Sequence, residues 1–189
     1  YVKAIMEERG GTVRICTIYT NRDPNRKTCN GENSSTSRGR DNYDNIEMRY
    51  EVRVPAGVTV NAESVNGSIT ATDLDEAASI ETVNGSIVFS GTTARHLETV
   101  NGGIKARFGK ADWDGTLKVS AVNGAIDLTF PAGLSAELSG ETVNGGINSD
   151  FPVTIDGKWG PKSFNGTIGR GGRQLKLETV NGGITLKKG

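Results

Sequence analysis

The chain has 189 residues, with 22 basic and 22 acidic side chains, so its formal net charge is zero. This balance argues against a nucleic-acid-binding protein, which needs surplus cations, and no apolar run approaches the ~20 residues that a membrane-spanning helix needs. Glycine is abundant at 26 residues and aromatic residues are few, which favours many short strands with Asn-Gly turns over a helical bundle.

The first predicted elements are two strands separated by a long polar stretch. Apolar residues alternate with polar ones over residues 13–19 and again over 46–54, which is the period of a strand with one buried face. Residues 21–45 between them predict a long surface loop, either mobile or in contact with a partner. We therefore assign residues 1–57 to an N-terminal cap or contact segment and residues 58–189 to a repeat domain.

The chain contains two cysteines, Cys16 and Cys29, on either side of the start of this loop. Their even number predicts one disulfide in an oxidising compartment, although two free thiols in a cytosolic protein fit the count as well. His96 is the only histidine and lies far along the chain, so we expect no zinc site, no other metal site and no cofactor.

The repeat domain is built on one phrase, Val-Asn-Gly-x-Ile, which recurs seven times with Phe in place of Val once. Successive Asn residues are 18, 17, 22, 21, 21 and 16 positions apart. Each unit reads as a strand, an Asn-Gly bend, a second strand and a connection of variable length. The predicted corner residues are Asn66, Gly67, Asn84, Gly85, Asn101, Gly102, Asn123, Gly124, Asn144, Gly145, Asn165, Gly166, Asn181 and Gly182.

Asn-Gly between alternating strands is also typical of β-hairpins, so a meander is the alternative to a solenoid. In a hairpin the recurring Val would lie on the face opposite Thr and Ile, in water, with no reason to recur. In a solenoid the corners stack about 4.8 Å apart, and Val can pack inward or against its copies above and below. Asn amides can then form a hydrogen-bonded ladder, with Gly supplying a positive φ at each corner.

We therefore predict an all-β, single-stranded β-solenoid, or β-helix, of about seven rungs. The repeats resemble those of the bacterial DUF4097 group, a family described as adhesins, whose units read T-x-N-G-x-I, and the run at residues 51–58 is similar to the strand that precedes them there. The resemblance covers about residues 46–189. It implies an exported or envelope-associated bacterial protein and brings no catalytic residues. The irregular repeat length favours a right-handed coil.

Two sets of residues are candidates for ligand contact. Trp113 and Trp159 lie in the variable connections and either cover the core or, if exposed on one flank, stack on sugars. A glutamate three residues before Asn recurs in five units, and stacking would align these carboxylates into a column. The column either binds cations such as Ca²⁺ or, as we favour, is a solvated face interleaved with Lys and Arg. Its members are Glu63, Glu81, Glu98, Glu141 and Glu178.

An enzyme of the β-helix polysaccharide-active class needs carboxylates gathered in a cleft beside Arg or Lys. Asp112, Asp114 and Asp127 are close in sequence, but no matching basic motif accompanies them. His96 has no partner Ser or Cys motif, so a nucleophilic triad is not expected. We therefore predict a protein that is not an enzyme.

The last repeat ends at Gly189 without a polar capping segment, so we expect it to form a bare terminal rung. Copies would then join head to tail by strand addition into a filament, unless Lys187 and Lys188 blunt the edge. The predicted function is a non-enzymatic, extracellular or cell-surface structural or adhesive module that contacts a surface glycan or protein. The alternative is a carbohydrate-binding module.

Overall fold

The computed structural model describes residues 2–19, 29, 47–156 and 161–189. The chain divides into two units, Tyr1–Val52 and Arg53–Gly189, and each is described here by itself. The described residues form strands and no helix, so none of them forms a helix that could cross a membrane.

The N-terminal unit contains an antiparallel hairpin of β1 (Val2–Arg9) and β2 (Thr12–Tyr19). Gly10 and Gly11 form the turn with φ of 58° and 75°, the positive values that a two-residue hairpin turn requires. The strand predicted over residues 13–19 is therefore confirmed as part of β2. Its partner precedes it in the chain, and the Gly-Gly pair was the sequence signal for that hairpin.

The second predicted strand is wrong for the residues that can be tested. Residues 47–54 form no strand, and Ile46 lies outside the described residues. Met48, Tyr50 and Val52 are exposed. Alternation of polar and apolar residues produces a strand only where a sheet edge accepts the backbone hydrogen bonds, and residues 47–54 belong to none of the strand pairs among the described residues.

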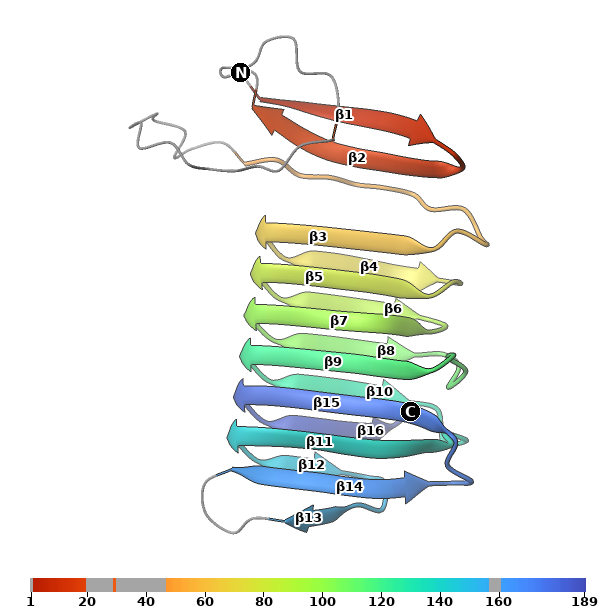
Figure 1. The fold of residues 1–189 in the computed structure, drawn as a ribbon, viewed down its shortest axis with the longest axis vertical. Helices are drawn as coiled ribbons and strands as arrows, with labels where there is room; N and C mark the ends of the chain where they lie inside the picture. The colour runs from red at the N-terminus through yellow and green to blue at the C-terminus, as the bar shows by residue number, and fades with distance from the viewer. Residues whose placement is uncertain (1, 20–28, 30–46, 157–160) are drawn as a thin grey trace. The chain divides into compact units, whose positions relative to one another are not determined.

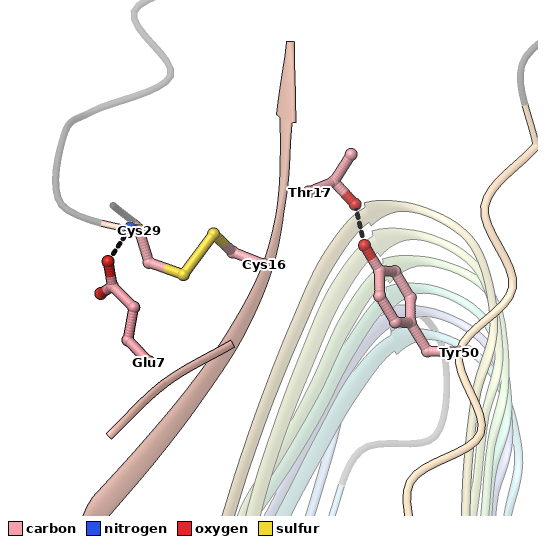
Figure 2. The surroundings of a disulfide bond; sticks show 5 residues. All are labelled: Glu7, Cys16, Thr17, Cys29 and Tyr50. Atoms are coloured by element: carbon pink, nitrogen blue, oxygen red, sulfur yellow. Dashed lines mark hydrogen bonds between the residues drawn. A yellow bond between two sulfur atoms is a disulfide. The ribbon is translucent and has the colours of Figure 1, made fainter. Parts of the chain in front are cut away.

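A disulfide joins Cys16 of β2 to Cys29, with their Cα atoms 5.8 Å apart, so the predicted disulfide is confirmed (Figure 2). The backbone N–H of Cys29 donates a hydrogen bond of 3.0 Å to Glu7 Oε1 of β1. A hydroxyl hydrogen bond also joins Thr17 of β2 to Tyr50. These contacts tie the hairpin to later residues of its own unit.

The second unit consists of two sheets in which neighbouring repeats pair in parallel (Figure 1). The smaller sheet contains, in spatial order, β4 (Ile69–Leu74), β6 (Ile87–Gly91), β8 (Ile104–Phe108), β10 (Ile126–Phe130), β16 (Ile184–Lys188) and β12 (Ile147–Ser149). The larger sheet contains, in spatial order from the same end of the stack, β3 (Val60–Asn66), β5 (Ala78–Asn84), β7 (Ala94–Asn101), β9 (Thr116–Asn123), β15 (Arg173–Asn181), β11 (Ala136–Asn144), β14 (Lys162–Ile168) and β13 (Thr154–Asp156).

This arrangement confirms the all-β prediction with stacked parallel strands and excludes a hairpin meander. Six strands of the larger sheet each pass through an Asn-Gly corner into a strand of the smaller sheet, namely β3, β5, β7, β9, β11 and β15. Ile at the start of the second strand is buried at Ile87, Ile104 and Ile126, and it packs between the two sheets. Burying such a side chain contributes roughly 1.5–3 kcal/mol, so the repeated Ile is a main source of stability.

The expectation of a bare C-terminal rung is wrong, because the last repeat lies inside the stack. β15 pairs with β9 on one side and β11 on the other, and β16 lies between β10 and β12 (Figure 1). The physical reason is that all corners carry the same residues, so any corner can stack on any other. The order along the chain therefore does not determine the order in space.

The sixth unit does not form a corner, which corrects the prediction for Asn165 and Gly166. Both residues lie within β14, which runs antiparallel to β11, with Asn165 in register with Ser139. Phe164, which replaces the usual Val, is 1% exposed. Its ring fills the space beside Gly140, where an added Cβ would lie 2.5 Å from the ring. This unit therefore caps the core beyond β11.

Candidate functional site

Six of the predicted corner asparagines form one hydrogen-bonded ladder on the surface of the solenoid. Each Nδ2 donates to the Oδ1 of the preceding asparagine in the stack over 2.7–2.9 Å. The backbone bonds run the other way, since the N–H of each corner Gly except Gly145, the last in the stack, donates to the Asn carbonyl of the next corner over 2.9–3.1 Å. The stack order is Asn66, Asn84, Asn101, Asn123, Asn181 and Asn144.

The corner glycines are required by close approach between stacked corners, which corrects the expected role of positive φ. Among these six glycines only Gly67 and Gly102 have a positive φ, at 147° and 157°. A Cβ on Gly124 would lie 1.8 Å from the carbonyl oxygen of Gly102, and one on Gly85 would lie 2.2 Å from that of Gly67. No side chain fits at that distance, and the same holds at five of the six corners, whereas at Gly67, at the end of the stack, the nearest atom to an added Cβ is 3.4 Å away.

The threonine two residues before Asn stabilises the corner from the core side through a hydrogen bond. Four such threonines are buried, and each hydroxyl donates to the carbonyl oxygen of a corner glycine in the neighbouring repeat over 2.8–3.0 Å. A buried hydroxyl without such a partner would destabilise the fold. These residues are Thr82, Thr99, Thr142 and Thr179.

The valine before each Asn lies on the outside of the larger sheet, so the option that it packs inward is wrong. Val83, Val122 and Val180 are each 40% exposed, and Val65 at the end of the stack is 65% exposed. Because flanking residues pair in register, the valines stack along the sheet. We call this column the valine stripe: Val65, Val83, Val100, Val122, Val180 and Val143.

Beside the valine stripe lies the predicted glutamate column, with Ser120 at one level. In spatial order it contains Glu63, Glu81, Glu98, Ser120, Glu178 and Glu141. The residues two positions earlier form the next column, in which His96, Lys118 and Lys176 supply cationic or ring nitrogen atoms.

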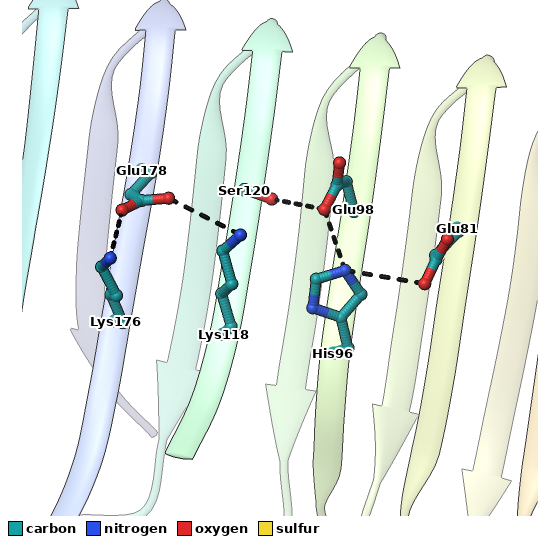
Figure 3. Close-up of polar contacts among 7 residues, drawn as sticks. All are labelled: Glu81, His96, Glu98, Lys118, Ser120, Lys176 and Glu178. Atoms are coloured by element: carbon teal, nitrogen blue, oxygen red, sulfur yellow. Dashed lines mark hydrogen bonds and ion pairs between the residues drawn. The ribbon is translucent and has the colours of Figure 1, made fainter.

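Polar contacts join these two columns (Figure 3). Lys176 Nζ lies 2.7 Å from Glu178 Oε1, and Lys118 Nζ lies 3.8 Å from Glu178 Oε2. His96 Nε2 lies 2.9 Å from Glu98 Oε2 and 3.7 Å from Glu81 Oε1. The hydrogen bond from Lys176 lowers the pKa of Glu178. The carboxylates are therefore interleaved with nitrogen groups as in a solvated face.

A family model places this architecture among known proteins. The model, described as Toastrack DUF4097, matches residues 11–187. The chain belongs to this family. The match confirms the resemblance found in the repeats and extends it back to residue 11, across the segment that carries both cysteines of this Toastrack protein.

One solved structure is similar to the chain: a crystal structure described as a "putative cell adhesion protein" from Clostridium sporogenes. It is 8% identical, with a TM-score of 0.48, and the match covers 71% of the Toastrack chain and 94% of that chain. No curated protein matches the sequence.

The tryptophan flank predicted for ligand contact is not available at Trp113. This side chain is 4% exposed, its Nε1 donates to the Gln174 carbonyl over 3.0 Å, and its ring packs 6.0 Å from that of Phe130. Trp113 therefore covers the core of the Toastrack solenoid, as the other interpretation proposed. Trp159 lies outside the described residues.

The aspartates considered for catalysis have different surroundings. Asp112 forms an ion pair with Arg173 at the connection before β9. Asp127 lies on the outer face of the smaller sheet, in register with Lys105 and Thr185. Within the described part of the Toastrack chain, no three His, Cys, Asp or Glu side chains are grouped to hold a metal ion.

Proposed function

We propose that this Toastrack protein is a non-enzymatic cell-surface module that adheres to a partner through the outer face of its larger sheet. The observation that supports this is the valine stripe running beside the glutamate column in continuous register. Exposed apolar residues that form a continuous patch rimmed by polar groups are typical of interaction sites. The Asn ladder and the parallel strands hold this patch rigid, which reduces the entropy lost on binding.

The outer face of the smaller sheet has fewer exposed apolar side chains, which supports the larger sheet as the adhesive face. Its outward positions carry Lys105, Arg107, Asp127 and Thr129, and Val88 is the large apolar side chain exposed among them. A single exposed apolar residue is normal on any protein surface. The apolar surface of the described solenoid strands is therefore concentrated on the larger sheet.

An extracellular or cell-envelope location fits the Cys16–Cys29 disulfide, because disulfides persist in oxidising compartments. The partner class remains a surface glycan or a surface protein. The described residues add no aromatic platform for sugar at Trp113, so a carbohydrate-binding function has lost one of its two predicted contact residues. The right-handed coil and the role of residues 1–57 as a contact segment stay predictions.

The adhesive face is tested by measuring how much fluorescently labelled protein binds to intact bacterial cells. Replacing Val122 and Val180 with Lys places charges in the middle of the stripe, and we expect at least a tenfold loss of bound protein. Replacing Thr129 and Thr185 with Lys adds equal charge on the smaller sheet and should leave binding unchanged. Equal losses in both variants, or no binding by the wild type, would refute the proposal.

Self-association through a solenoid end now rests on the β3/β4 end. Val60, Ala62 and Ile69 there are only partly buried within the solenoid unit, whereas Phe164 and β14 cover the core at the opposite end. Because these partly buried apolar residues lie at one end of the solenoid, they support pairing of two copies and not the filament predicted from the sequence. Sedimentation velocity over a range of concentrations tests this, and a monomer throughout would remove the proposal.

A further inference from the structure

The Asn-Gly corners carry a chemical liability that the fold suppresses unequally. In an Asn-Gly pair the glycine backbone nitrogen can attack the asparagine side-chain carbonyl carbon, Cγ. Glycine allows this most readily because it has no side chain to obstruct the ring. We propose that Asn144–Gly145 is the described corner at which the folded chain converts spontaneously to aspartate and isoaspartate, while stacking protects the other corners of the ladder.

The reaction needs only water as a co-reactant. A bond forms between Gly145 N and Asn144 Cγ, the Cγ–Nδ2 bond breaks, and ammonia leaves with the proton that Gly145 N has lost. The five-membered succinimide is then opened by water at either carbonyl. Opening at one carbonyl gives aspartate, and opening at the other gives isoaspartate, in which the main chain runs through the side-chain carbon.

Five corners hold the attacking nitrogen in a hydrogen bond. The backbone N–H groups of Gly67, Gly85, Gly102, Gly124 and Gly182 each donate to the Asn carbonyl of the next corner over 2.9–3.1 Å. Attack requires that this bond breaks and that the corner leaves the parallel ladder. The same bonds that stack the corners therefore oppose the reaction.

The corner at Gly145 is the last one in the stack. Among the hydrogen bonds between described residues, the Gly145 N–H donates none, although Asn144 is as exposed as its counterparts. The Asn144 carbonyl accepts a hydrogen bond of 3.1 Å from Gly182 N–H. That carbonyl shares a peptide group with Gly145 N, so the bond stabilises the negative charge that forms when the nitrogen loses its proton.

At the opposite end of the ladder the glycine N–H does donate a hydrogen bond, unlike that of Gly145. Asn66 is the first asparagine, and its Nδ2 donates to no other asparagine of the ladder, but Gly67 N–H is bound to the Asn84 carbonyl over 2.9 Å. Among the described residues the leaving group at Asn66 therefore has no acceptor, whereas the nucleophile, Gly67 N, is held by its hydrogen bond. We therefore expect the rates to rank Asn144 first, Asn66 second and the interior corners last.

The test uses the full folded chain incubated in mildly alkaline buffer and digested with trypsin. Cleavage after Lys118 and Lys158 leaves Asn123 and Asn144 in one peptide, residues 119–158, so fragment ions compare both corners in the same molecules. We expect Asn144 to convert about fivefold faster than Asn123, the factor that one net hydrogen bond supplies. In denaturant the two sites should convert at similar rates. Asn30–Gly31 lies outside the described residues and is followed in its own peptide.

Equal conversion at Asn123 and Asn144 in the folded chain would overturn the proposal, as would faster conversion at Asn123. A second measurement is independent of the chemistry. Amide hydrogen exchange should be fast at Gly145 and slow at Gly102 and Gly124, because only the latter two N–H groups are bonded in the ladder. Protection at Gly145 equal to that at Gly124 would also overturn it.

Discussion

The corner glycine shows how one missing side chain determines the spacing of the whole stack. In Gly124→Ala the new Cβ would lie 1.8 Å from the Gly102 carbonyl oxygen, in the middle of the ladder. The corners must then separate, and we expect the free energy of unfolding to fall by about 1–3 kcal/mol, the usual cost of overpacking. Urea denaturation followed by circular dichroism measures this loss.

Gly133→Ala is the matched control. Nothing lies within 4 Å of an added Cβ at Gly133, and its φ is not in the left-handed range. Its stability should stay within about 0.5 kcal/mol of the wild type. If Gly124→Ala unfolded at the same urea concentration as Gly133→Ala, close approach would not be the reason for the repeated glycine.

The identity of the corner residues could be predicted from the sequence, but the reason for some of them could not. Repetition of Asn and Gly pointed to stacking, because only stacked corners must be alike. The role of Gly124 depends on the carbonyl of another repeat at 1.8 Å, and one sequence gives no such distance. The outward position of Val122 likewise became clear only from its exposure.

The pair formed by Lys176 and Glu178 predicts a dependence of stability on pH. The hydrogen bond from Lys176 lowers the pKa of Glu178 below its ordinary value of 4.5. A group whose pKa is lowered in the folded state stabilises the fold above its unfolded pKa, and this contribution disappears as the pH falls through the folded value. Stability should therefore fall on acidification below about pH 4.5.

Lys176→Met is the variant that separates this pair from other carboxylates. It removes the hydrogen bond to Glu178, so part of the stability that the wild type loses on acidification should already be absent at neutral pH. Thermal melts of both proteins between neutral and acidic pH measure the difference. Parallel melting curves, with a constant gap at every pH, would contradict this assignment.

At the scale of elements, the position of β15 and β16 in the middle of the stack makes the C-terminus essential. β15 contacts β9 and β11, and β16 contacts β10 and β12. Removing residues 169–189 would leave two sheet edges facing each other across an empty level. We expect this truncation to abolish the single cooperative unfolding transition of the solenoid.

Removal of residues 187–189 alone is the matched control, since it keeps β15 and the buried Leu186. This shorter truncation should unfold cooperatively, with hydrogen exchange in β9 and β11 close to that of the wild type. If the last repeat instead lay at the end of the stack, loss of residues 169–189 would leave the protection of β9 and β11 from hydrogen exchange intact. That result would contradict the observed strand order.

The different environment of β14, the strand that does not form a corner, could have been anticipated from its sequence. Phe164 is the one aromatic residue among the positions before Asn, and Lys162 replaces the usual Glu three residues before Asn165. A large apolar residue suits a buried position better than an exposed stripe. These departures were visible, but an antiparallel pairing with β11 was not, because pairing direction depends on the path of the preceding connection.

At the scale of the whole molecule, the sequence predicted two parts of different character. The repeats predicted parallel stacking correctly because their period is long and their corners are alike. The alternation over residues 47–54 predicted a strand that the structure lacks, since a strand also needs a partner edge. A partner cannot be read from a segment alone, which is why the N-terminal part was predicted less well than the repeats.

The two units should respond differently to reduction. Both cysteines belong to the N-terminal unit, and the solenoid unit contains none. A two-stranded hairpin is only marginally stable in water, and a disulfide that closes a loop of about 15 residues adds roughly 3 kcal/mol. Reduction of Cys16–Cys29 should therefore accelerate amide exchange in β1 and β2 while β5 to β10 stay protected.

The double variant Cys16→Ala, Cys29→Ala provides the control, because it should show the fast exchange in β1 and β2 without reductant and no further change when reductant is added. Hydrogen exchange resolved by peptide compares both units in one sample. If reduction also lowered protection across β5 to β10, the stability of the solenoid would depend on the N-terminal unit. The stacked corners would then not be sufficient to hold the repeats together.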